Sequence, residues 1–328
     1  MSARKRVVIV GAGLAGLSAA RLLEPDYEVV VLDKGRGVGG RMATRRIGAA
    51  TFDHGAQFFT THTAEFAAIV AEWETAAVAA PWFKGRIGPA GIVAADGHTR
   101  YRGVASMNAV AKHLARDLDV RCATPVVALA ATTTGWNVIL ENGVLESDAV
   151  VMTAPVPQAL SLFDAGEVSL TADDREALIS IRYEPCLALL AALRGPSGLT
   201  MPGAVSPDVE PIGWMADNQM KHVSNVAAVT IHATPAFSAD HWSSAPAEIA
   251  EELLRAAALD AQPVYGMEQV QRWRYARPTI IHPQRCLVAN GLPPLVCSGD
   301  AFGGAKVEGA VLSGVAAANA IKQLLGSG

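Results

Sequence analysis

A glycine-rich turn near the N-terminus has the residue types and spacing that point most directly to chemistry. It reads Gly11-Ala12-Gly13-Leu14-Ala15-Gly16 and follows a buried β-branched run at residues 6–10, RVVIV. Gly11 permits a tight turn, Gly13 lets the backbone approach a pyrophosphate, and Gly16 lets a following helix lie close to the strand. The free N–H groups at the start of such a helix bind phosphate. The spacing therefore predicts a dinucleotide site.

An acidic residue after the next strand completes this pattern. Residues 17–23 have helical character, and residues 27–32 (YEVVVL) form a second buried strand that ends at Asp33. An acid at this position accepts hydrogen bonds from an adenosine ribose. Strand, glycines, helix, strand and acid in register predict a Rossmann-like domain with a parallel sheet.

A second glycine-containing block follows the acid and is rich in cations. Residues 34–46 read KGRGVGGRMATRR, with Gly39 and Gly40 exposing backbone beside Arg41. A run of cations is also compatible with a solvated face or a nucleic-acid patch. A guanidinium fork beside bare backbone can, however, hold a diphosphate through two parallel hydrogen bonds.

This block resembles the second flavin signature of the amine-oxidase-like flavoproteins, an acid followed by x-x-x-R-x-G-G-R. The resemblance implies that the cofactor is FAD, bound non-covalently, with Lys34, Arg36, Gly40 and Arg41 among its ligands. Within that superfamily the chain is similar to the renalases, in particular the bacterial ones. The stretches that carry this likeness are residues 33–46, 52–60 (FDHGAQFFT), 272–276 (RWRYA) and 297–302 (CSGDAF).

The same resemblance assigns further cofactor contacts along the chain. It implies backbone contact with the adenine at Val126 and Val127, and contact with the ribityl or pyrophosphate part at Gly299 and Asp300. A helix over residues 307–325 would direct its first turn at the flavin, where its dipole stabilises an anion. The remaining implied contacts are Gln57, Phe58, Val307, Glu308, Gly309 and Ala310.

Renalases oxidise dihydro isomers of NAD(P)H, and the resemblance implies that reaction here. A 2- or 6-dihydro isomer would pass a hydride to flavin N5 and leave as β-NAD(P)+, and O2 would take the electrons to give H2O2. The donor departs as an aromatic pyridinium, so the step needs no general base. It needs a flat slot and exclusion of water.

Candidate site residues outside the flavin motifs are a glutamine, a histidine and several aromatics. Gln57 and His232 are the candidates for direct roles, against the alternative that each is structural. Aromatic walls for the slot would come from Phe59, Trp214, Trp242 and Trp273, with Phe58, Trp82 and Phe83 as further candidates. Ordinary core packing is the alternative for each of these rings.

The elements that must hold these residues divide into two expected domains. The FAD-binding domain is expected to be discontinuous, with residues 1–61, 97–164 and 271–328. Residues 62–96 and 165–270 would form a substrate domain with a mixed sheet. We expect an α/β plus α+β fold in which residues 96–103 (DGHTRYRG) are a loop. Helices are expected at 107–114 and 247–257. Residues 120–129 are expected to form a strand, a turn at Pro125 and a second strand, and further strands are expected at 136–141, 149–153, 225–232 and 294–297.

Composition limits the classes of function and location. Of the 328 residues, 51% are hydrophobic and 18% charged, which excludes disorder, and the net charge of −4 does not favour a nucleic-acid partner. No stretch of about 20 apolar residues predicts a membrane span. The four cysteines are scattered, which predicts buried thiols in a reducing cytoplasm and no metal site. The expected partners are a small-molecule dinucleotide and O2.

Three other functions remain open at this level. An FAD-dependent amine oxidase would share the cofactor and the peroxide product. A desaturase-like or porphyrinogen-oxidising flavoenzyme would usually be longer and carry a membrane-docking element. A flavin- or NAD-bound sensor without turnover would also lack an acid–base constellation.

Overall fold

The computed structural model describes residues 4–89, 91, 93–207 and 210–326. Within them the chain forms two compact units, each built from separate stretches. The first unit contains the residues up to Gly40, Ala111–Arg182, and the chain from Pro278 onward. The second unit contains Arg41–Val110 and Tyr183–Arg277.

The first unit is built on a six-stranded sheet in the order β17-β18-β11-β1-β2-β7. Apart from the antiparallel β17–β18 pair, its neighbouring strands are parallel. Runs such as VVIV in β1 are fully buried, as expected of parallel strands covered on both faces. The bounds are Arg6–Val10 (β1), Glu28–Leu32 (β2), Asp119–Arg121 (β7), Ala149–Met152 (β11), Leu287–Val288 (β17) and Leu295–Cys297 (β18).

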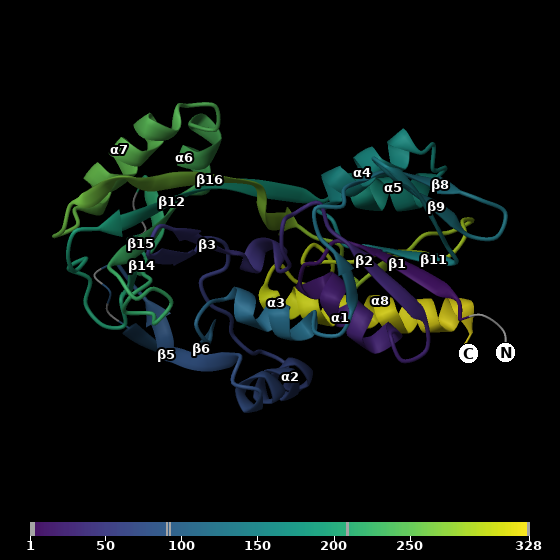
Figure 1. The fold of residues 1–328 in the computed structure, drawn as a ribbon, viewed down its shortest axis with the longest axis horizontal. Helices are drawn as coiled ribbons and strands as arrows, with labels where there is room; N and C mark the ends of the chain where they lie inside the picture. The colour runs from purple at the N-terminus through teal and green to yellow at the C-terminus, as the bar shows by residue number, and fades with distance from the viewer. Residues whose placement is uncertain (1–3, 90, 92, 208–209, 327–328) are drawn as a thin grey trace. The chain divides into compact units, whose positions relative to one another are not determined.

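Helices α1 (Leu14–Leu23) and α8 (Val307–Leu325) pack together on one side of this sheet (Figure 1). Gly314 permits the contact, because a Cβ there would lie 2.1 Å from the Ala15 carbonyl oxygen. A three-stranded antiparallel sheet and two helices lie on the other side (Figure 1). These elements are Val126–Ala131 (β8), Trp136–Leu140 (β9), Gly143–Ser147 (β10), Val156–Ala165 (α4) and Ala172–Ile179 (α5).

The second unit is built on a five-stranded sheet in the order β13-β14-β15-β12-β16. Alternate residues of its strands face opposite sides, and the side with Leu189, Met215 and Ile231 packs against helices α6 and α7. The other side packs Leu190 and Ala228 against Phe52. The bounds are Arg182–Leu193 (β12), Ala204–Val205 (β13), Ile212–Asp217 (β14), Ala228–Ala233 (β15), Pro263–Ile280 (β16), Pro235–Asp240 (α6) and Pro246–Ala257 (α7).

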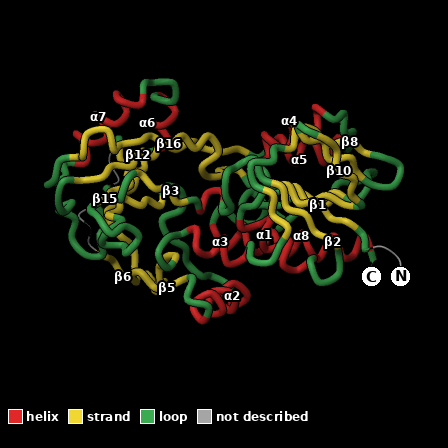
Figure 2. Tube along the Cα trace, in the orientation of Figure 1, coloured by secondary structure: helices red, strands yellow, loops and turns green. Residues whose placement is uncertain are grey.

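Two ribbons and a helix complete the second unit. The antiparallel ribbon β3 (Thr44–Ile47) and β4 (Ala50–Asp53) follows the short 3-10 helix Gly40–Met42. The ribbon β5 (Ala79–Ile87) and β6 (Val93–Gly103) is antiparallel and lies beside α2 (Ala64–Thr75), as Figure 2 shows. Helix α3 (Asn108–Leu114) crosses the division between the units.

Most expected elements are present, and one is wrong. The expected loop at residues 96–103 is the second half of strand β6, paired with β5. The helix expected over residues 307–325 has those bounds. The fold class is confirmed, although the pairings described in the second sheet are antiparallel rather than mixed.

The compact units divide the chain at different positions from the expected domains. Residues 41–61 belong to the second unit because β4 packs on β15 of its sheet. Assignment of a cofactor role to one domain and a substrate role to the other stays a prediction.

Candidate cofactor and substrate sites

The glycine turn of the first unit has the geometry that a phosphate site requires. Gly11 has a φ of +113°, and its N–H donates to the Leu32 carbonyl at 2.7 Å. A Cβ on Gly16 would lie 2.0 Å from the Gly11 carbonyl oxygen, so only glycine allows this contact between helix and turn. A Cβ on Gly13, the N-cap of α1, would meet nothing within 4 Å. The space beside Gly13 is therefore available to a ligand.

Asp33 is oriented by the backbone of both glycine-containing segments. One carboxylate oxygen accepts from Ala12 N at 2.7 Å and the other from Gly35 N at 2.6 Å. These bonds leave further lone pairs on a half-buried carboxylate at the end of β2. The arrangement suits an acceptor for ribose hydroxyls.

The second glycine block lies against the first. Gly39 N donates to Ala12 O at 2.8 Å, and a Cβ on Gly40 would lie 3.6 Å from the Gly13 Cα. Of the predicted cations, Arg36 is exposed, and Lys34 donates from Nζ to Gln158 Oε1 at 3.0 Å. Arg41 belongs to the second unit, where its Nη1 donates to the carbonyls of Tyr275 and Ala276 at 3.3 Å.

The C-terminal cofactor residues also lie in the first unit. Gly299, with a φ of +137°, donates its N–H to Ser313 Oγ of α8 at 2.8 Å. A Cβ on Gly309 would lie 2.0 Å from the Gly304 carbonyl oxygen, so the first turn of α8 touches the preceding loop. Half-buried Asp300 sits next to Gly299. Val307, Glu308, Gly309 and Ala310 form that first turn, and Val126 and Val127 begin β8.

The residues of the first unit therefore fit a flavin dinucleotide. Open space at Gly13, the start of α1, an oriented carboxylate and two abutting glycine segments are what a nucleotide diphosphate needs.

In the second unit, the segment after β4 is organised around a carboxylate that the sequence did not single out. Asp53 and Lys221 are both fully buried, and Asp53 Oδ2 accepts a hydrogen bond from Lys221 Nζ at 2.9 Å. Its other carboxylate oxygen accepts from Thr44 Oγ1 at 2.6 Å and Met107 N at 2.9 Å. Burial lowers the pKa of Lys221, and the charge of Asp53 opposes that change. The pair fixes the start of residues 53–58.

Two histidines and a tryptophan meet at the next residue of this segment. The His54 carbonyl accepts from Trp273 Nε1 at 2.9 Å and lies 3.3 Å from His232 Nε2. The rings of His54 and Trp273 stack with centroids 5.3 Å apart. Burial lowers the pKa of each histidine from 6.5 to about 4. Both imidazoles are therefore neutral at pH 7 and are not poised as bases for neutral-pH chemistry.

Gln57 is buried and turned back onto its own segment. Its Nε2 donates to the Asp53 carbonyl at 2.7 Å and to the Gly55 carbonyl at 3.2 Å, so the amide holds the turn together. These contacts support a structural role, and the predicted role at the flavin or substrate stays a prediction.

An aromatic cluster, comprising Phe58, Trp82, Phe83 and Trp214, lies beside this segment. The Phe58 ring is 5.3 Å from that of Trp214 and 6.3 Å from that of Phe83, between ring centroids. Trp214 pairs with His232 across β14 and β15, so both side chains share the sheet face that packs against the segment. The cluster therefore brings together candidate rings from three separate parts of the sequence.

Two cations contact the aromatic cluster. Arg100 Cζ lies 5.8 Å from the Phe58 ring centroid, and Lys221 Nζ lies 5.2 Å from the Trp82 ring centroid. Cations over ring faces are attracted by the aromatic quadrupole. The cluster therefore borders two cations, each of which is paired with a carboxylate, Arg100 with Asp96 and Lys221 with Asp53.

Two aromatics expected to line the slot lie elsewhere. Phe59 is 3% exposed and packs among Phe66, Trp73 and Tyr101, so it belongs to the core. Trp242 packs with the helix-covered side of the sheet, away from the face of Trp214. The sequence of the segment FDHGAQFF does not indicate which of Phe58 and Phe59 is a core residue. The bridge between Phe59 and Tyr101, which places Phe59 in the core, is visible only in the structure.

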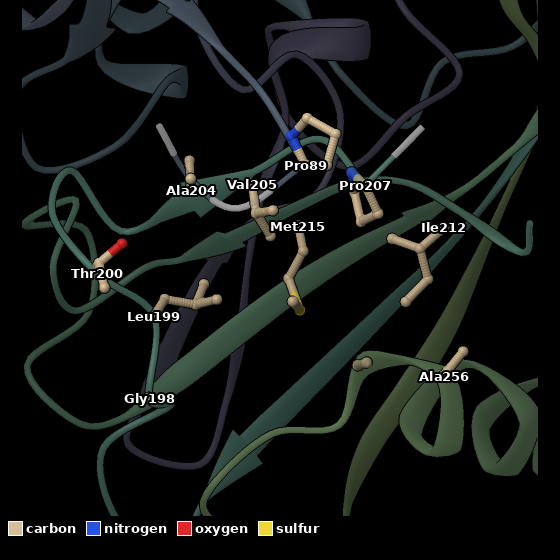
Figure 3. Close-up of a pocket in the computed structure, with 12 residues that line it drawn as sticks. Pro89, Gly198, Leu199, Thr200, Ala204, Val205, Pro207, Ile212, Met215 and Ala256 are labelled. Carbon is tan, nitrogen blue, oxygen red and sulfur yellow. The ribbon is translucent and has the colours of Figure 1, made fainter. Parts of the chain in front are cut away.

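A separate apolar cavity of about 270 Å³ opens on that helix-covered side of the second sheet (Figure 3). Leu199, Val205, Ile212, Met215 and Ala256 are among its lining residues. Met215 follows Trp214 in β14 and faces the opposite way. None of the predicted site residues lines this cavity.

Burial holds the four thiols in their protonated form, which is a poor nucleophile. Burial raises the pKa of Cys186 and of Cys297 to about 12, and it also raises the pKa of Cys122 and Cys286. The described residues include no group of three or more His, Cys, Asp or Glu placed to hold a metal ion. In the same part of the chain, no helix is long and apolar enough to cross a membrane.

Sequence reasoning missed Asp53, Lys221 and His54. Asp53 and His54 lie within the FDHGAQFFT stretch, whose resemblance to the family marks it as a candidate site. Nothing in the stretch indicates that these two side chains are buried. Lys221 carried no signal, because its partner is 168 residues away.

Known proteins resemble the chain along its whole length. It is 24% identical to the renalase of Mus musculus over 350 residues, which cover 98% of this chain and 99% of the relative. Its fold matches cyclohexylamine oxidase from Brevibacterium oxydans with a TM-score of 0.74, at 15% identity over 98% of this chain and 99% of the other. Putrescine oxidase bound to putrescine matches with a TM-score of 0.66, at 14% identity over 97% of this chain and 99% of the other.

Two family models match the sequence. Residues 9–73 match an NAD(P)-binding Rossmann-like domain, in agreement with the glycine turn and Asp33. Residues 95–322, more than half of the chain, match the flavin-containing amine oxidoreductases. The protein therefore belongs to the flavin-containing amine oxidoreductase family and is an FAD-dependent oxidoreductase.

Proposed function

We propose that the protein oxidises 2- or 6-dihydro isomers of NAD(P)H to β-NAD(P)+, with O2 as the final electron acceptor and H2O2 as the product. Bound FAD supplies the hydride acceptor and the reaction with O2. The protein holds the dinucleotide cofactor, orients a flat substrate and excludes water. The resemblance to renalases along the chain supports this reaction.

The observation that carries the proposal is the charge around the aromatic cluster. Among the described residues, Arg100 and Lys221 contact its rings; Lys221 is neutralised by buried Asp53, whereas the Asp96 partner of Arg100 is partly exposed and can be exchanged for another anion. A dihydropyridine nucleotide is flat and carries anionic phosphates, so rings bordered by cations suit it. An amine substrate is itself a cation in water, so it could not take the place of Asp96 on the Arg100 guanidinium.

The neutral histidines agree with this assignment. A pKa of about 4 leaves His54 and His232 weak bases. A protonated amine must lose a proton before it can donate a hydride, whereas a dihydropyridine loses only the hydride and becomes aromatic. Oxidation of the proposed substrate therefore does not require either histidine to act as a base.

Amine oxidation is the second candidate. The family model and the fold shared with cyclohexylamine oxidase and putrescine oxidase support it. The Phe58–Trp214 pair also offers two aromatic faces, a common arrangement around an amine in this superfamily.

Anaerobic reduction of the purified holoenzyme separates the two candidates. Three substrates are offered separately: mixed NADH isomers from non-selective borohydride reduction of NAD+, authentic 4-NADH, and a panel of amines. We expect rapid loss of the yellow colour with the isomer mixture and formation of β-NAD+. Bleaching by amines alone would replace the proposal with the second candidate. A flavin inert to all three would exclude both and favour a sensor.

A further inference from the structure

Strand β6 brings an arginine to the aromatic cluster. Arg100 pairs with Phe83 across the β5–β6 ribbon, and its guanidinium lies over the Phe58 ring. Only 11% of its side chain is exposed, so most of its aliphatic part is packed. The strand and the two rings therefore restrict where the guanidinium fork can go.

The fork is occupied by a carboxylate from its own strand. Arg100 Nη1 donates to Asp96 Oδ1 at 2.7 Å, and Nη2 lies 2.6 Å from Oδ2. This is the paired geometry in which a guanidinium also binds phosphate. Hydrogen bonding from Arg100 lowers the pKa of Asp96 to about 2, so the carboxylate is ionised at neutral pH.

An exchange of Asp96 for a phosphate would cost little. The Asp96 side chain is 29% exposed, and partly exposed ion pairs contribute little net stability. Asp96 also has a second partner that stays available, because its Oδ1 accepts from His98 N at 3.0 Å. The carboxylate can therefore release the guanidinium without becoming an isolated buried charge.

Neighbouring cations are less suited to the same role. Lys221 is fully buried and paired with Asp53. Arg102 donates to the Gly103 carbonyl, and burial lowers its pKa. Arg86 is exposed and pairs with Ala94 in the other half of the ribbon.

We propose that Arg100 binds a phosphate group of a pyridine nucleotide substrate, and that Asp96 occupies the guanidinium fork in its absence. The inference rests on the proposed function and identifies a residue that selects the substrate class. A phosphate on Arg100 would place the attached nicotinamide ring beside the aromatic cluster, since Phe58 lies under the guanidinium. An uncharged or cationic substrate would gain nothing from this contact.

Two ligands that differ by one phosphate test this assignment without turnover. Nicotinamide mononucleotide and nicotinamide riboside are titrated into the holoenzyme by calorimetry. The wild-type protein should bind the mononucleotide about tenfold more tightly or better, and added salt should reduce that preference. Arg100→Gln should abolish the preference, and Arg100→Lys should restore part of it. Arg255→Gln, which breaks only an exposed pair with Glu251 on α7, is the matched control.

Asp96→Asn gives a prediction of opposite sign. Removal of the competing carboxylate should strengthen mononucleotide binding several-fold and leave riboside binding nearly unchanged. FAD content and far-ultraviolet circular dichroism report the folding of each variant. If Arg100→Gln does not fold, Arg100→Lys and Asp96→Asn carry the test.

A wild-type protein without preference for the phosphate, or an Arg100→Gln protein that keeps the preference, would overturn the inference. Weaker or unchanged mononucleotide binding in Asp96→Asn would do the same. Failure of the proposed function is distinguishable, because it appears as a flavin that no dihydro isomer bleaches. The phosphate-free riboside isomers belong in that assay, since they need no contact with Arg100.

Discussion

Replacement of Lys221 by Met should strongly destabilise the second unit. Lys221 and Asp53 are both fully buried, with Nζ and Oδ2 2.9 Å apart. Met fills a similar volume but leaves the Asp53 carboxylate without a counter-ion in a dry environment. Asp53 would keep the hydrogen bonds from Thr44 and Met107 N, which offset only part of that cost.

The size of the effect follows from the burial of both charges. Loss of one partner from a buried ion pair costs about 3–5 kcal/mol in the free energy of unfolding. Asp53→Asn should cost a similar amount, because it leaves the Lys221 ammonium unpaired. The double variant Asp53→Asn, Lys221→Met contains no buried charge at this position, so it should recover much of the loss. A coupling free energy of about 2 kcal/mol or more is expected between the two sites.

Urea denaturation of the four proteins, monitored by tryptophan fluorescence, measures this coupling. Arg121→Gln, which removes an exposed pair with Asp119, serves as the control and should change the free energy by less than about 1 kcal/mol. Additive losses in the double variant would refute the reasoning, since they would mean that the two charges do not stabilise each other. A Lys221→Met protein as stable as wild type would refute it as well.

Two further predictions concern the cofactor turn and acid stability. Gly13→Ala should fold normally but bind FAD at least about tenfold more weakly, because its Cβ meets no protein atom and would occupy ligand space. Gly16→Ala should instead destabilise the fold by about 2 kcal/mol or more, because its Cβ would clash with the Gly11 carbonyl oxygen. Equal effects of the two substitutions on stability would contradict this prediction. The pKa values of His54 and His232 are near 4 in the folded protein and 6.5 in the unfolded chain. The unfolded chain therefore takes up protons first, so the free energy of unfolding should be constant above pH 6.5 and should fall between pH 6.5 and pH 4. The loss should be roughly 3 kcal/mol for each histidine. His232→Gln should flatten that slope in pH-dependent denaturation while the exposed His222→Asn should not, and identical slopes in all three proteins would exclude the effect.

The fold of the first unit could be predicted because its signals are local. Each parallel strand is a short apolar run, and the glycine turn links β1 to α1 within one stretch of sequence. Strand β6 was not recognisable in this way. Its residues are mostly exposed or half-buried and include several charges, because the β5–β6 ribbon is a two-stranded sheet. It therefore lacks the alternation that marks a strand with one buried face.

The candidate site of the second unit was predicted only in part for a related reason. Trp214 and His232 stand out as residue types, but their common sheet face depends on the register between β14 and β15. The aromatic cluster joins residues from the turn after β4, from β5 and from β14. Such contacts between distant segments leave no periodic pattern in the sequence. The ion pair of Asp53 and Lys221 is the extreme case.

The stretch of sequence that resembles the family and the charged residues near the aromatic cluster have different roles in the structure. The stretch FDHGAQFFT resembles the family, yet its most buried members support the turn: Asp53 holds Lys221, and Gln57 holds the Asp53 carbonyl. The charged side chains that contact the aromatic cluster come instead from β6 and from the loop after β14. A fold does not by itself determine the substrate, because the substrate class depends on the side chains that a given chain places at the site. We therefore expect the substrate class of this protein to depend on Arg100 and its neighbours rather than on the turn at residues 53–58.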